Sequence, residues 1–219
     1  MVTALSLTAS AQKETRDVKN FTEVGFAVPG DMYVQVGPAF SLVIEGDADF
    51  LKKVITEVRG TRLVIKTENS WNTGNNKIIV HVTMPSVEGL SLSGSGKIFM
   101  ESPLKGSSLS LAISGSGKML AGDISYEELS CAISGSGSFD FSGTGKVSDA
   151  DLAISGSGDF NAPGLEITTL EVGVSGSGSC DVYVTGKLEA RISGSGDVLY
   201  SGNPRIDVSS SGSGKVRSK

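Results

Sequence analysis

The chain has 219 residues, of which 19 are Lys or Arg and 24 are Asp or Glu, so its net charge is −5 at pH 7. This acidic balance argues against nucleic-acid binding and against a polybasic contact with a membrane, since both need clustered Lys and Arg. Glycine supplies 29 residues, well above its usual share of about 7%, while 38% apolar residues suffice for a core. The single His leaves almost no material for zinc or imidazole chemistry. We therefore expect no cofactor.

The N-terminal residues are typical of an export signal. Residues 2–11 are small and apolar, and Ala9-Ser10-Ala11 fits a signal-peptidase cleavage site. The basic segment that normally precedes such a stretch is missing, so an unstructured tail is the alternative interpretation. We expect residues 1–11 to be the remnant of a secretory signal peptide and residues 12–219 to form one elongated domain. No other stretch approaches the roughly 18 apolar residues that a membrane-spanning helix needs.

Residues 20–90 alternate between apolar and polar side chains in four segments, which predicts β-strands. These segments are residues 32–36, 40–45, 63–66 and 78–84. Between the second and third, residues 47–58 carry apolar side chains at helical spacing, and Asp47 or Asp49 would be the N-cap of a short helix. We expect this part to begin the stack of repeats that follows it and to cover one end of that stack.

Residues 91–219 form a repeat. The tetrapeptide Ser-Gly-Ser-Gly begins at residues 93, 114, 134, 155, 175, 193 and 211. Apolar residues stand one, three and five positions before each tetrapeptide, and the nearest column reads Leu92, Ile113, Ile133, Ile154, Val174 and Ile192, then Ser210. The alternation restarts after the tetrapeptide, and the segments between repeats, such as residues 122–128, would form a second corner. Each repeat is therefore a strand, a glycine turn and another strand.

A unit of about 20 residues cannot bury its own apolar face, whereas stacked units can. The sequence thus predicts an all-β fold, a right-handed parallel β-helix of Ser-Gly-Ser-Gly coils with a β-rich N-terminal part containing one short helix. Left-handed coils would show a six-residue apolar repeat, which is absent. The tetrapeptide itself is explained by corners that need positive φ angles, which glycine adopts readily. A serine nucleophile or phosphate loop is not indicated, because no GxxxxGK[ST] motif is present.

Several further segments co-occur with the repeats. They are residues 21–24 (FTEV), 32–36 (MYVQV), 42–47 (LVIEGD), 61–65 (TRLVI) and 82–85 (VTMP). Over about residues 20–217 this layout resembles the "putative auto-transporter adhesin, head GIN domain" family of exported proteins found mainly in Bacteroidetes. The resemblance implies a right-handed β-helix located in the periplasm or on the cell surface of a Gram-negative bacterium. It supplies no catalytic residues.

Three carboxylates form a candidate cation patch. Asp151 and Glu171 stand on consecutive repeats in the outward column four residues before each tetrapeptide, and Asp149 is two residues from Asp151. The register gives these three no basic partner, whereas Glu189 in the same column is flanked by two basic residues. The alternative interpretation is a solvated acidic patch, since the calcium-binding GGxGxDxUx repeat is absent.

Four other side chains merit individual interpretation. Trp71, in a polar loop, would stack on a sugar or cover the end of the β-helix. His81 would point outward from its strand into solvent. Cys131 and Cys180 stand in different apolar columns of non-adjacent repeats, so we expect two buried free thiols rather than a disulfide.

Two functions are compatible with the sequence. The first is a non-catalytic, exported binding or structural module of the cell envelope, adhesin-like, whose flat coil faces bind a glycan or an envelope protein. The alternative is a polysaccharide-degrading enzyme, because β-helices also support such chemistry. An enzyme would need carboxylates with a nearby basic residue in a groove, and the sequence offers only the patch of Asp149, Asp151 and Glu171. We expect no enzyme, no nucleic-acid partner and no membrane span, and the oligomeric state is left open.

Overall fold

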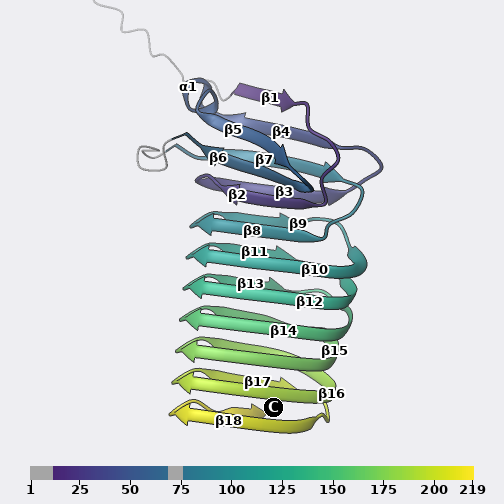
Figure 1. Ribbon diagram of the computed structural model, residues 1–219, viewed down its shortest axis with the longest axis vertical. Helices are drawn as coiled ribbons and strands as arrows, with labels where there is room; N and C mark the ends of the chain where they lie inside the picture. The colour runs from purple at the N-terminus through teal and green to yellow at the C-terminus, as the bar shows by residue number, and fades with distance from the viewer. Residues whose placement is uncertain (1–11, 69–75) are drawn as a thin grey trace, which may run out of the picture.

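The strands stack into an elongated coil whose successive turns lie one above another (Figure 1). The structure is a computed structural model and describes residues 12–68 and 76–219. The expected signal-peptide remnant, residues 1–11, lies outside the described residues. Within these residues, every strand belongs to one connected sheet, and the apolar side chains form one continuous buried cluster.

The repeated part consists of β8 to β19. Their bounds are β8 Gly89–Gly94, β9 Lys97–Met100, β10 Leu104–Gly115, β11 Lys118–Ala121, β12 Ile124–Gly135, β13 Ser138–Phe141, β14 Gly145–Gly156, β15 Asp159–Gly176, β16 Ser179–Gly194, β17 Asp197–Ser201, β18 Arg205–Gly212 and β19 Val216–Ser218. Each Ser-Gly-Ser-Gly corner joins a strand on one face of the coil to a strand on the other. The prediction of a parallel β-helix built from these coils is confirmed.

The coils stack in parallel and in register. Ile113 of β10 pairs with Ile133 of β12, which pairs with Ile154 of β14, and the tetrapeptide serines pair in the same way. The corners are also bonded to each other, because the Ser136 N–H donates to the carbonyl of Gly115 with an N···O distance of 2.9 Å. The apolar columns are almost completely buried inside the coil. The period-two pattern therefore identified the inward face correctly.

The second corner of each coil is a bend within a strand. In β12, Tyr126 and Leu129 are both buried although they stand three positions apart, and the intervening Glu127 and Glu128 are both exposed. The coil-to-coil pairing omits Glu127. The alternation thus changes phase at this point, which turns the chain from the short side of the coil to the long side.

The N-terminal part contains β1 to β7 and the helix. Their bounds are β1 Gln12–Arg16, β2 Glu23–Ala27, β3 Gly30–Val36, β4 Ser41–Gly46, α1 Ala48–Leu51, β5 Val54–Arg59, β6 Arg62–Thr67 and β7 Ile78–Met84. β2 and β3 form a coil that lies between β6 and β7 on one side and β8 and β9 on the other, all in parallel. β1, β4 and β5 pair antiparallel and lie at the N-terminal end of the stack (Figure 1).

The helix is shorter than the sequence predicted. Asp47 is its N-cap, as expected, with its carboxylate accepting from the backbone N–H groups of Asp49 and Phe50 at 3.1 and 3.0 Å. However, the helix ends at Leu51, and the second half of the predicted segment is strand β5. The reason is that residues 54–58 are rich in β-branched side chains, and the following Gly60, with φ +61°, closes a tight hairpin to β6.

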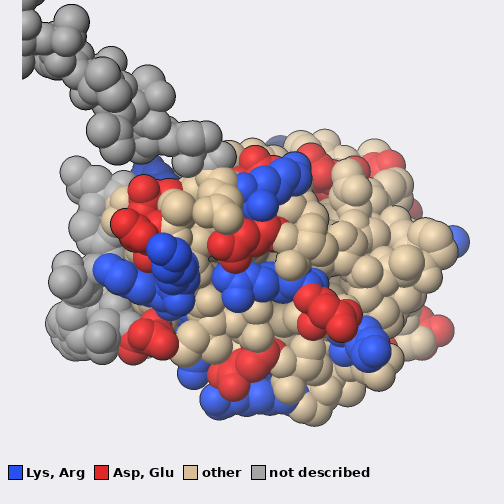
Figure 2. Space-filling model, turned by 90° about the horizontal axis from the view of Figure 1, so that it is seen from above, with Lys and Arg blue, Asp and Glu red and all other residues tan. Residues whose placement is uncertain are grey.

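The two ends of the stack differ. Figure 2 looks onto the N-terminal end, where Lys and Arg side chains are interspersed with Asp and Glu. At the other end, β18 pairs with β16 and β19 pairs with β17, and neither has a strand on its outer side in the described chain. Every residue of β18 is exposed. Among residues 12–68 and 76–219, no helix is long and apolar enough to cross a membrane.

Candidate binding surface

A long shallow groove runs along the outer face of the coils. Its volume is about 820 Å³, and its lining is mostly apolar. Ala112, Ala132, Ala153 and Gly173 form its centre, in the outward column two residues before each tetrapeptide. The first serine of each tetrapeptide lines one margin, from Ser93 to Ser211. We call this surface the coil-face groove.

The groove exists because its central side chains are small. Ala132 pairs with Ala112 on one side and with Ala153 on the other, so methyl groups repeat along the stack at the strand spacing of about 4.8 Å. The buried isoleucines of the neighbouring column lie directly beneath them. The shape and apolar character of the coil-face groove therefore come from the backbone and from methyl groups rather than from mobile polar side chains.

An arginine stands at each end of this small-residue column. Arg62 extends over Gly25 and donates to the Ser91 hydroxyl through Nη2. At the other end, Arg191 follows Gly173 in the column and pairs with Glu171 and Glu189. The guanidinium groups thus flank an uncharged run of small residues from Ser91 to Gly173, and the column continues beyond Arg191 to Ser209.

The three predicted patch carboxylates lie together on neighbouring coils. Asp149 and Asp151 are on β14 and Glu171 is on β15, and all three line a second depression of about 550 Å³. The expectation that Glu171 lacks a basic partner is wrong, because Arg191 reaches it diagonally from the next coil. The described residues contain no group of three or more His, Cys, Asp or Glu placed to hold a metal ion.

His81 is exposed, as predicted, but it belongs to an aromatic stack that the sequence did not indicate. Its ring lies parallel to Tyr33 with a centroid distance of 5.1 Å, and Tyr33 stacks on Phe99 at 4.9 Å. Tyr33 therefore has a neighbouring ring stacked on each of its two faces. Trp71, for which the sequence left sugar stacking and a cover for the end of the β-helix as alternatives, lies outside the described residues.

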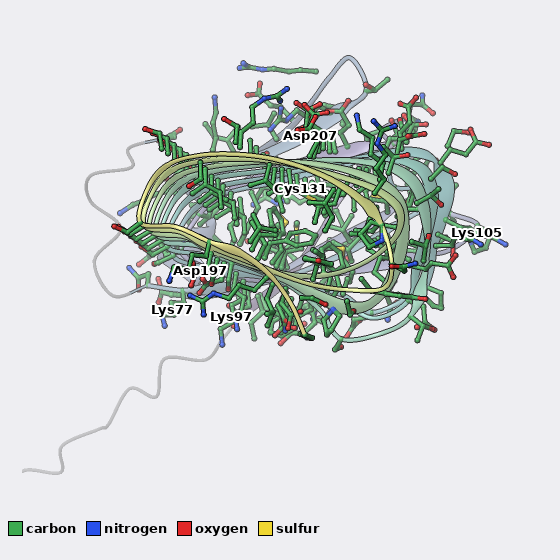
Figure 3. The ribbon with its side chains drawn as sticks, turned by 90° about the horizontal axis from the view of Figure 1, so that it is seen from below. Lys77, Lys97, Lys105, Cys131, Asp197 and Asp207 are labelled. Atoms are coloured by element: carbon green, nitrogen blue, oxygen red, sulfur yellow. The ribbon has the colours of Figure 1, made fainter. Side chains whose placement is uncertain are left out.

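Cys131 and Cys180 are both free and buried, as predicted. Figure 3 shows Cys131 among the side chains that fill the coil interior. Burial raises the pKa of the Cys180 thiol to about 12, with the Asp159 carboxylate adding to the effect. Burial raises the pKa of Cys131 as well, and here the Asp151 charge contributes. A raised thiol pKa means that the reactive thiolate is scarce at neutral and mildly alkaline pH.

Native protein will therefore resist alkylation at pH 8, whereas denatured protein will take up two labels without any reductant. The physical reason is that both thiols are enclosed and protonated in the folded coil but are ordinary exposed cysteines after unfolding. Mass spectrometry after iodoacetamide treatment measures the labels. Labelling of the native protein at the rate of a free thiol would contradict the burial, and an unlabelled denatured protein would reveal a disulfide.

Fold and surface together define a class: a parallel β-helix with a charged N-terminal cap and a flat, small-residue coil face. The chain belongs to the family described as "Putative auto-transporter adhesin, head GIN domain", whose model matches residues 20–204. The resemblance inferred from the sequence is thereby confirmed. The family suggests an exported protein that binds an external partner.

Solved structures share this fold. A "putative adhesin" from Bacteroides fragilis is 22% identical with a TM-score of 0.85, and the match covers 97% of this chain and 98% of that one. A "putative lipid binding protein" from Parabacteroides distasonis is 24% identical with a TM-score of 0.77 and coverages of 95% and 96%. A second Parabacteroides distasonis chain, a "putative adhesin", is 21% identical with a TM-score of 0.79 and coverages of 96% and 98%. No curated protein sequence matches the chain.

Proposed function

We propose that the protein is an exported, non-catalytic binding module that holds an extended partner in the coil-face groove, in the periplasm or on the surface of a Gram-negative bacterium. The observation that carries this proposal is the groove itself, which crosses the outer faces of several coils and is lined by small side chains. The family description and the adhesin names of similar structures are in keeping with binding rather than catalysis.

A glycan strand of the envelope or of a host surface is the partner that we favour. The serine column repeats one hydroxyl per coil along the groove margin, in register from Ser93 to Ser211. Each hydroxyl can both donate and accept a hydrogen bond, as can the hydroxyls of a sugar. The methyl groups of Ala112, Ala132 and Ala153 provide the apolar surface on which the C–H faces of sugar rings rest. A polymer with repeated hydroxyls therefore matches a surface with repeated hydroxyls.

A lipid acyl chain is the second candidate partner. It is favoured by the mostly apolar lining of the groove, and a similar structure is named a lipid-binding protein. An extended hydrocarbon chain would gain free energy by covering the alanine methyl groups. Arg191, one coil before the C-terminal end of the groove, would lie near an anionic headgroup. Binding assays with fatty acids and with glycans, both without detergent, distinguish a lipid partner from a glycan partner.

The enzyme alternative receives less support from the surface. Glycan-cleaving chemistry commonly uses a pair of carboxyl groups positioned around the scissile bond, one of them shielded enough to stay protonated. Asp149, Asp151 and Glu171 are all exposed to solvent, and Glu171 forms an ion pair with Arg191. These groups suit a charged surface more than an acid–base site.

Blocking the groove tests the proposal. Ala132→Trp should abolish binding, because Ala132 is exposed at the groove centre and an indole would fill the space above the neighbouring alanines. Asn161→Trp is the matched control, since Asn161 is exposed on β15 outside the groove. Binding of both variants and the parent is measured on an array of envelope and host glycans and with fluorescent fatty acids.

The expected result is a loss of at least about tenfold in affinity for Ala132→Trp and no change for Asn161→Trp. Strands accept tryptophan readily, so both variants should fold. Equal binding by the two variants would contradict the groove as the binding surface. Cleavage of a bound glycan by the parent protein would contradict the non-catalytic proposal.

A further inference from the structure

The C-terminal coil presents an open edge with exposed apolar side chains. Ile206 and Val208 stand in the inward columns of the repeat, yet they are 42% and 43% exposed. Their equivalents in the preceding coil, Leu188 and Ala190, are fully buried. The view from this end shows the last coil lying across the stack with no strand over it (Figure 3). Unpaired backbone groups and apolar side chains together form an edge that another strand can cover.

The charges on β18 are mismatched within the chain. In the register with β16, Arg205 lies beside Lys187 and Asp207 lies beside Glu189, so each meets a like charge. Neither forms an ion pair in the described part of the protein. By contrast, two other charged residues of the last coil are paired: Lys219 with Asp181 at 2.6 Å and Arg217 with Asp197 at 3.7 Å. β18 therefore carries one positive and one negative group, two residues apart, that form no ion pair among the described residues, although the Asp207 charge acts at longer range on Arg191 of the preceding coil.

We propose that two copies of the chain associate tail to tail, with β18 pairing antiparallel to β18 of the second copy. In an antiparallel pair centred on Ile206, Arg205 lies opposite Asp207 of the second copy, and the same contact occurs twice by symmetry. The two Ile206 side chains then face each other on the inner side. Antiparallel self-pairing in this register brings the opposite charges and the two Ile206 side chains together and places Val208 opposite Pro204 of the second copy, whereas a parallel copy would place like charges together.

The association closes at two copies. Among the described residues the N-terminal end offers no comparable apolar edge, because its edge strand β1 consists of polar side chains and carries the ion pair Lys13–Glu45, with the pair Lys52–Asp49 at α1 nearby. A head-to-tail filament is therefore disfavoured, and a two-fold contact engages the C-terminal edge of both copies. The end of one coil is smaller than a standard interface, so the dimer should be weak and concentration-dependent, with a Kd on the order of 100 μM.

Charge reversal provides a specific test by sedimentation equilibrium between 10 μM and 1 mM, concentrations chosen around the Kd of about 100 μM. Arg205→Asp should weaken the dimer at least about tenfold, because two attractive contacts become two repulsive ones. The same change should not harm the monomer, since the introduced aspartate lies beside Lys187. Asp207→Arg should act likewise, its introduced arginine lying beside Glu189. Mixing the two variants should restore association as a heterodimer.

Apolar variants locate the interface independently. Ile206→Lys should abolish the dimer, whereas Ile79→Lys should leave it intact, because Ile79 is equally exposed, at 44%, but lies on β7 far along the stack. A protein that stays monomeric up to 1 mM, tenfold above the expected Kd of about 100 μM, overturns the proposal. So does a dimer that survives Ile206→Lys or is lost in Ile79→Lys. Failure of the mixed charge variants to associate overturns the proposed pairing.

Discussion

Ile154→Asp will abolish folding of the coils, whereas Ala153→Ser in the adjacent position will leave the melting temperature nearly unchanged. Ile154 is 2% exposed and lies in the inward column, with its methyl group against the corner at Gly178. A buried, unpaired carboxylate costs several kcal/mol, about 4 or more at such a site. Ala153 is exposed, and serine already occupies equivalent outward positions at Ser91 and Ser209.

Circular dichroism during heating measures both variants against the parent protein. The neighbouring coils share the core with Ile154, so local unfolding removes support on both sides. The surface change should stay within about 0.5 kcal/mol of the parent in free energy of unfolding. Equal melting temperatures for Ile154→Asp and Ala153→Ser would show that the inward face has been assigned wrongly.

Gly156→Ala will destabilise the protein by about 3 kcal/mol or more. Gly156 has φ +121°, and a Cβ there would lie 2.4 Å from the carbonyl oxygen of Gly135 in the preceding corner. That oxygen belongs to the backbone of a stacked coil, so it cannot move aside without disturbing the corner ladder. The added methyl group is therefore unfavourable for two reasons: alanine is strained at this positive φ, and its Cβ collides with the Gly135 carbonyl oxygen.

Gly122→Ala is the control for this prediction. A Cβ at Gly122 would have no atom within 4 Å. Because alanine restricts the unfolded chain, the control should be neutral or stabilising by about 0.5 kcal/mol. Chemical denaturation of the two variants gives the free energies of unfolding. A Gly156→Ala protein as stable as the Gly122→Ala protein would mean that the corners tolerate side chains.

The coil register was predictable residue by residue because the repeats stack in parallel without offset. Ile113, Ile133 and Ile154 occupy one sequence column and one spatial column. In such a stack, position within the repeat determines both the neighbour and the face. The tetrapeptide spacing alone therefore located seven corners and most of the core.

The N-terminal part was less predictable because its spatial order differs from its chain order. β3 lies between β7 and β9, so Tyr33 meets both His81 and Phe99, and no local pattern indicates that contact. Residues 54–58 fit a helical period, but hairpin closure at Gly60 favours strand β5. Tertiary pairing thus overrode a local preference.

The candidate surface was also only partly predictable. Sequence columns placed Asp149, Asp151 and Glu171 on one face, which the structure bears out. They did not show that Arg191 reaches Glu171 diagonally, since that contact depends on side-chain length and direction. The groove was missed because small outward residues such as Ala132 carry no chemical signal of their own. Only their alignment over several coils produces a concave surface.

Alignment over several coils also makes the groove a molecular ruler. Each repeat adds one strand spacing of about 4.8 Å to its length. Arg62 stands beside its N-terminal end, and Arg191 stands one coil before its C-terminal end. Duplication or loss of one complete repeat would change the distance between these two arginines by one increment and leave the cap untouched. Evolution can therefore adjust the length of partner that this surface accommodates in discrete steps. Each step changes the number of coils and leaves the contacts within a coil as they are.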